Sequence, residues 1–172
     1  MASSSTCTPI DASDIVSIQA PAVIVLGERH AMQPDMRRAE RIAKKLQRAA
    51  PVTIALEAVH QKYQVVLDNF AANKLAPETL EDHLDWQNSW GFPYQPYAPL
   101  ITAAQHDMTV LGAGLDLGKR PDGRTSPIPN GYINILRDAI GEHEIPVELE
   151  GEFVQSMAWR DFGIAEAAIN GW

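Results

Sequence analysis

Acidic and imidazole side chains follow two apolar segments in the first third of the chain. Glu28 and His30 follow the apolar run 21–26 after Gly27, and Glu57 comes directly after the run 52–56. Neighbouring parallel strands lie about 4.8 Å apart, and ligands of open parallel sheets bind beyond the carboxyl ends of the strands. If the two runs are neighbouring strands, we expect these three side chains to converge on one cleft.

Two kinds of chemistry suit two carboxylates and an imidazole in such a cleft. Glu28, His30 and Glu57 can ligate a divalent metal such as zinc or iron. Alternatively, His30 acts as a general base that Glu57 orients. A structural role is the third interpretation: Glu28 caps the next segment or pairs with Arg29, and His30 lies at the surface. His60 follows the second run, where we expect it to cap a helix.

Five of the twelve aromatic residues lie within the twelve positions 86–97. This cluster can form the wall of a site for a flat apolar ligand. A tyrosine in it can also ligate ferric iron. The alternative interpretation is a small core under a long loop. The aromatic residues of this segment are Trp86, Trp90, Phe92, Tyr94 and Tyr97.

Both strands and helices must position these residues. The runs 21–26, 52–56 and 108–111 are rich in apolar and β-branched residues and predict buried strands. Helical spacing predicts helices over 35–50, 61–74, 77–86, 99–107, 132–140 and 151–169. A strand, a helix and a second strand form a βαβ unit, which makes the strands parallel. The sequence therefore predicts an α/β fold, with a mostly parallel sheet flanked by helices and a ligand cleft at the carboxyl ends of its strands.

Composition limits the classes of protein to which the chain can belong. The 172 residues carry 14 basic and 22 acidic side chains, a net charge of −8, which argues against a nucleic-acid partner. No apolar run approaches the length of a membrane span. The single cysteine, Cys7, excludes a disulfide or thiolate cluster within one chain. Without a visible signal peptide we expect a cytoplasmic protein, or an envelope or periplasmic one if the chain is trimmed.

Several segments, taken in order and spacing, resemble the ChaN-like haem-binding family of the Tiki/erythromycin-esterase superfamily. The resemblance runs from about residue 20 to the C-terminus and predicts one shortened α/β domain over 20–172, preceded by a polar tail over 1–19. The segments that carry it are Val25–His30, Ala55–Glu57 with Gln61, Trp86, Tyr97–Leu100, Val110–Ala113, Phe153–Gln155 and Arg160–Asp161.

The resemblance implies a small-molecule site for haem or iron. In the haem-binding branch a tyrosine is the iron ligand, and Tyr94 and Tyr97 are the candidates here. Trp90 then belongs to the aromatic wall. Further ligand-binding candidates in the matching segments are Arg29, Arg160 and Asp161.

The esterase branch implies a different activity for the same cleft. There the imidazole after the first strand is the base and the acid of the second strand supports it, which gives His30 and Glu57 catalytic roles on an ester, amide or peptide. Sequence alone leaves open whether the chain is an enzyme.

Two departures from the family pattern bear on the site. Ala31-Met32 stands where an Asp-Asn pair commonly follows the first histidine. The chain also ends before the family's usual C-terminal strand and its second G-x-x-H motif. We therefore expect that a homodimer can complete the site.

Overall fold

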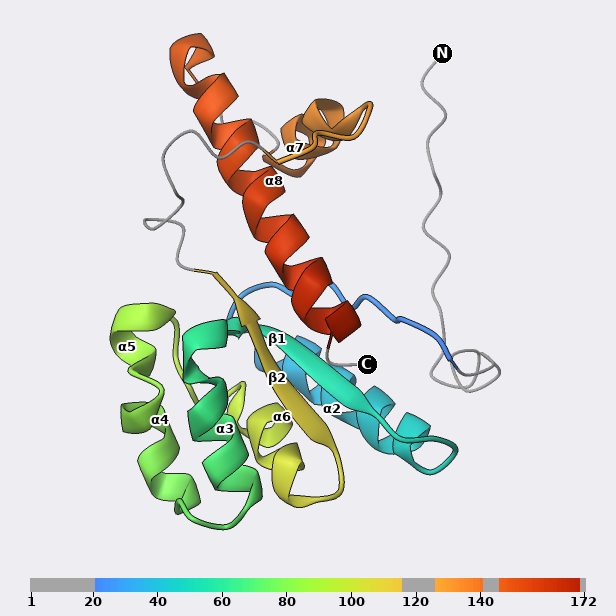
Figure 1. Cartoon of the computed structure of the whole chain (residues 1–172), viewed down its shortest axis with the longest axis vertical. Helices are drawn as coiled ribbons and strands as arrows, with labels where there is room; N and C mark the ends of the chain where they lie inside the picture. The colour runs from blue at the N-terminus through green and yellow to red at the C-terminus, as the bar shows by residue number, and fades with distance from the viewer. Residues whose placement is uncertain (1–20, 116–125, 141–145, 171–172) are drawn as a thin grey trace.

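The computed structural model describes residues 21–115, 126–140 and 146–170. Its centre is a two-stranded parallel sheet of β1 (Thr53–His60) and β2 (Thr109–Gly114), with helices on both sides (Figure 1). The register pairs Thr53 with Thr109 and Leu56 with Gly112, and shifts at a bulge before His60 pairs with Gly114. The α/β class and the parallel pairing are confirmed.

The strand predicted over 21–26 is wrong. Residues 21–29 form neither strand nor helix, and the side chains of Val23 and Val25 are 62% and 88% exposed. Their β-branched composition suits a strand, but a strand also needs a neighbour whose main chain accepts and donates hydrogen bonds. Within the described part of the chain, no backbone hydrogen bond joins residues 21–28 to another segment.

The parallel crossover consequently differs from the one predicted. Helix α2 (Gln33–Gln47) forms close to the predicted bounds 35–50, with a proline and Asp35 in its first turn, but within the described residues it does not connect two strands. The crossover instead lies between β1 and β2. It consists of short helices and 3-10 turns: η1 (Gln61–Tyr63), α3 (Gln64–Ala71), η2 (Pro77–Thr79), α4 (Leu80–His83), α5 (Trp86–Ser89), α6 (Ala98–Thr102) and η3 (Ala103–Gln105).

Two helices follow β2. Helix α7 spans Tyr132–Ile140, as predicted, and α8 spans Val147–Asn170, starting four residues before the predicted 151. Figure 1 shows α8 crossing the end of the sheet at which β1 and β2 finish. No helix within the described ranges is long and apolar enough to cross a membrane.

The main core lies between the sheet and the crossover helices. Leu56 and Ala58 face it from β1, where residues two apart share a face. Leu67 and Phe70 pack from α3, and Trp86 from α5. Helix α8 contacts the end of the sheet through the ion pair of Arg160 with Glu57 and the hydrogen bond from the side chain of Gln61 to the carbonyl of Gly163. This arrangement leaves the strand ends between the crossover helices and α8.

Candidate functional site

A cavity of about 370 Å³ opens to solvent at the carboxyl ends of β1 and β2. This is the edge at which ligands of parallel sheets bind, and the volume lies within the range of small-molecule sites. A cavity thus lies at the edge of the sheet where the sequence predicted a cleft. The residues that line it are His30, Glu57, His60, Lys62, Asp85, Asn88, Ser89, Trp90, Phe92, Gly114, Leu115 and Arg160.

His30 lies in this cavity beside a carboxylate and two aromatic rings. Its Nδ1 lies 2.6 Å from Oε1 of Glu28. Its ring centroid lies 4.9 Å from those of both Trp90 and Phe92, edge-on to the indole. A carboxylate on one ring nitrogen orients an imidazole and fixes its tautomer. The other nitrogen, Nε2, is then available to a ligand or a proton.

Glu57 lines the cavity but pairs with a cation. Its Oε1 lies 3.4 Å from Nη1 of Arg160 on α8, and Arg160 also contacts the carboxylate of Asp161 at 3.1 Å. The carboxylate in contact with His30 is therefore that of Glu28, not that of Glu57.

The three predicted metal ligands do not form one cluster. Across the described ranges, no group of three or more histidine, cysteine, aspartate or glutamate side chains is placed to hold a metal ion. Glu28 contacts His30, whereas Glu57 is held by Arg160. The structure thus assembles a carboxylate–imidazole pair rather than a three-ligand metal centre.

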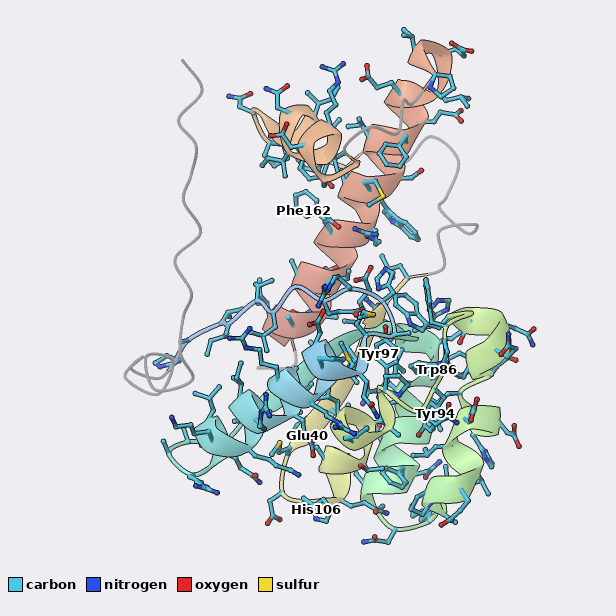
Figure 2. The ribbon with its side chains drawn as sticks, turned by 180° about the vertical axis from the view of Figure 1, so that it is seen from behind. Glu40, Trp86, Tyr94, Tyr97, His106 and Phe162 are labelled. Carbon is cyan, nitrogen blue, oxygen red and sulfur yellow. The ribbon has the colours of Figure 1, made fainter. Side chains whose placement is uncertain are left out.

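The two candidate tyrosines belong to the core. Figure 2 shows Tyr94 and Tyr97 beside Trp86, and their ring centroids lie 5.1 and 5.2 Å from that of the indole. Burial raises the pKa of Tyr94 to about 12, with a smaller contribution from the charge of Glu81. Burial likewise raises the pKa of Tyr97. Neither phenol lines the cavity, and both are held in the neutral form.

Two further candidates lie outside the cavity lining. The guanidinium of Arg29 forms two hydrogen bonds with Asp35, at 2.9 and 3.0 Å, in the first turn of α2. This contact holds the pKa of Asp35 below its usual value. Asp161 accepts a hydrogen bond from the hydroxyl of Tyr132 at 2.6 Å. Arg160 and Trp90, in contrast, line the cavity as the sequence suggested.

The sequence did not single out several cavity residues. His60 was expected to cap a helix, but β1 extends four residues beyond the predicted run and places it at the strand end. Lys62 follows on η1, with its Nζ 4.7 Å from the ring centroid of Tyr63. Asp85 immediately precedes α5 in a left-handed conformation, with φ 47°. It lines the cavity together with Asn88 and Ser89 of α5. The strand-end rule that selected Glu57 would have found His60 had the strand been drawn longer.

A close approach of the two strands sets the bulge that carries Glu57 and His60. A Cβ on Gly114 would lie 2.2 Å from the carbonyl oxygen of Glu57, which is main chain and cannot rotate away. Only glycine fits there. The bulge redirects the side chains at the strand end.

Comparison with known proteins gives one family. The family model described as haem-binding uptake, Tiki superfamily, ChaN matches residues 15–120, more than half of the 172. The matched range includes His30, Glu57 and His60 and ends before Arg160. No curated protein and no solved structure matches the chain.

Proposed function

The chain belongs to the ChaN family of the Tiki superfamily, and from that premise we propose that its strand-end cavity binds haem, with His30 as the iron ligand. The observation that carries the proposal is the hydrogen bond of 2.6 Å between Nδ1 of His30 and Glu28. An imidazole whose second nitrogen contacts a carboxylate is a common metal-ligand arrangement, and imidazole is a common axial ligand of haem iron.

The walls of the cavity fit the rest of such a ligand. Trp90 and Phe92 flank His30 with aromatic surface suited to a porphyrin face. Arg160 and Lys62 supply two cations for the carboxylates that haem carries. When bound, haem would supply iron for transport or redox chemistry. The residues of this chain would orient the imidazole, cover the ring and neutralise the carboxylates.

Haemin titration of the full chain tests this proposal. We expect a saturable shift of the Soret band that His30→Ala weakens by at least about tenfold, because the substitution removes the ligand nitrogen. His106→Ala is the control, since that exposed histidine lies at the far end of the molecule (Figure 2). Equal titration curves for the wild type and His30→Ala would reject His30 as the ligand. The absence of saturable binding would reject the haem site.

The metal content of the purified protein separates the related alternatives. Elemental analysis and an absorption spectrum of protein purified without additives distinguish haem, iron without haem, and zinc. Iron with a Soret band supports the haem proposal. Zinc or iron without that band would reject haem as the group that the purified protein carries.

The same hydrogen bond supports a hydrolase as the second candidate function. With Glu28 on Nδ1, the Nε2 atom of His30 can take a proton from a water molecule that attacks an ester or amide carbonyl. The imidazolium then returns the proton to the leaving alcohol or amine. Loss of a positioned base costs about 10²–10⁴-fold in rate. If wild type and His30→Ala hydrolyse 4-nitrophenyl acetate at the same rate, this candidate is rejected for esters of that class.

A further inference from the structure

We propose that Tyr97 is a positioning residue for His30, and that its buried hydroxyl selects the imidazole tautomer presented to the cavity. The importance of that tautomer for haem rests on the proposed function. The tautomer itself is a property of the free chain and can be measured without a ligand.

The Tyr97 hydroxyl contacts the side chain of Glu28, two residues before His30, and the main chain of Ala31, the residue after it. It donates to Oε1 of Glu28 at 3.0 Å, and it accepts from the backbone N–H of Ala31 at 3.0 Å. Tyr97 stands at the start of α6, 66 residues after Ala31. Its side chain is 2% exposed and packs against Trp86. The hydroxyl is thus held by the core and reaches the segment that carries Glu28, His30 and Ala31.

Counting protons assigns the tautomer. The N–H of Ala31 occupies the Tyr97 oxygen as a donor, so the hydroxyl proton is directed to Oε1 of Glu28. The same oxygen lies 2.6 Å from Nδ1 of His30. A carboxylate oxygen can only accept, so Nδ1 carries the proton. In the neutral ring Nε2 then holds the lone pair.

Glu28 depends on Tyr97 for its position. Within the described ranges, Tyr97 and His30 are the only hydrogen-bond partners of its side chain, and the other carboxylate oxygen is buried without one. Residues 21–28 make no backbone hydrogen bond to another described segment. Removing the Tyr97 hydroxyl would therefore free the carboxylate that holds the imidazole proton.

The backbone conformation of Ala31 indicates a second role for the Tyr97 hydroxyl. Its φ is 60°, in the left-handed region that a residue with a Cβ rarely adopts. The hydrogen bond from its N–H to Tyr97 offsets this unfavourable conformation, which turns the chain directly after His30. One hydroxyl thus sets the carboxylate before the imidazole and the backbone after it.

The test is the tautomer of His30 in the free, full chain, measured by nitrogen NMR of ¹⁵N-histidine-labelled protein near pH 8. In the wild type we expect the proton on Nδ1. In Tyr97→Phe we expect a shift toward the Nε2–H form that predominates in free histidine. Tyr94→Phe is the matched control, because it removes the hydroxyl of another buried tyrosine that packs on Trp86 but has no described hydrogen-bond partner. We expect no tautomer change in this control.

A second variant tests whether Tyr97 acts through Glu28. Glu28→Ala changes a partly exposed side chain, so it reports on the same tautomer even if Tyr97→Phe fails to fold. If Tyr97 acts through Glu28, the double variant shifts the tautomer no further than Glu28→Ala alone. Haemin affinity should fall about 10- to 100-fold in Tyr97→Phe and remain unchanged in Tyr94→Phe.

The outcomes separate this inference from the proposed function. A tautomer shift in Tyr97→Phe without haemin binding by any variant supports the positioning role and rejects the haem site. An unchanged His30 tautomer in both Tyr97→Phe and Glu28→Ala overturns the positioning role, whatever the haemin titration gives. An equal shift in Tyr94→Phe also overturns it, because the effect would then be a general disturbance of the core.

Discussion

The indole Nε1 of Trp86 donates a hydrogen bond to the main-chain carbonyl of Phe92 over 2.7 Å. Trp86 is fully buried, whereas Phe92 lies in the cavity wall beside His30. This bond joins the core of the crossover helices to the loop that follows α5. It therefore sets the position of the Phe92 ring, which packs on the imidazole of His30.

Trp86→Phe tests this link between core and site. The substitution keeps an aromatic ring but leaves the Phe92 carbonyl without its donor and a small void in the core. We expect a loss of about 1–3 kcal/mol in the free energy of unfolding, measured by urea denaturation. Trp159→Phe, at a partly exposed position on α8, is the control. Equal losses in the two variants would show that the hydrogen bond contributes little.

Gly114→Ala tests the close approach of β2 to the bulge of β1. The added Cβ would lie 2.2 Å from the carbonyl oxygen of Glu57, so the backbone must move. We expect destabilisation by about 1–3 kcal/mol, as for other overpacked sites. Gly151→Ala is the matched control, because that glycine lies in α8 with nothing within 4 Å of an added Cβ.

The control should change stability in the opposite direction. Alanine is favoured over glycine inside a helix by about 0.5–1 kcal/mol, so Gly151→Ala should raise the thermal midpoint while Gly114→Ala lowers it. A Gly114→Ala protein as stable as the wild type would contradict the tight strand contact.

Arg160→Met tests the charge of the cavity. Arg160 pairs with Glu57 at 3.4 Å and, among the described residues, is one of two lysine or arginine side chains in the lining. We expect haemin affinity to fall about 10- to 150-fold, because hydrogen bonds to charged groups contribute roughly 1.5–3 kcal/mol. The affinity for the dimethyl ester of haemin, which lacks the carboxylates, should not change. Arg41→Met, on the exposed face of α2, is the control. A similar loss with the ester would show that Arg160 acts through the shape of the cavity.

The raised pKa of Tyr94 predicts a loss of stability at alkaline pH. Burial raises the pKa of its phenol to about 12 in the folded chain, against about 10 when unfolded. The folded state thus favours the neutral phenol. This contribution to stability is complete below pH 10 and is lost as the pH rises toward 12. Between these values, the wild type should lose more unfolding free energy than Tyr94→Phe. Parallel curves would contradict the raised pKa.

Local pattern was sufficient for part of the fold and of the site. The spacing of apolar residues predicted α7 at its observed bounds, and the strand-end rule placed Glu57 at the cavity, whereas His30 reaches the same cavity from a segment that is not a strand. The bounds of α7 depend on residues close together in sequence, and the place of Glu57 depends on a general property of parallel sheets. The run 21–26 shows where such patterns fail, since its composition describes side chains that suit a strand and does not supply the neighbouring strand.

The amino-acid sequence by itself determined the α/β class, the family and the side chains available for chemistry. Only the tertiary structure decided which carboxylate meets His30, and that Tyr97 belongs to the core rather than to the cavity wall. The physical reason is distance along the chain: Glu28 and Tyr97 are 69 positions apart, and their hydrogen bond of 3.0 Å exists only because α6 packs beside the segment that carries His30. Hydrogen bonds require atomic proximity, which the folding of the crossover helices provides.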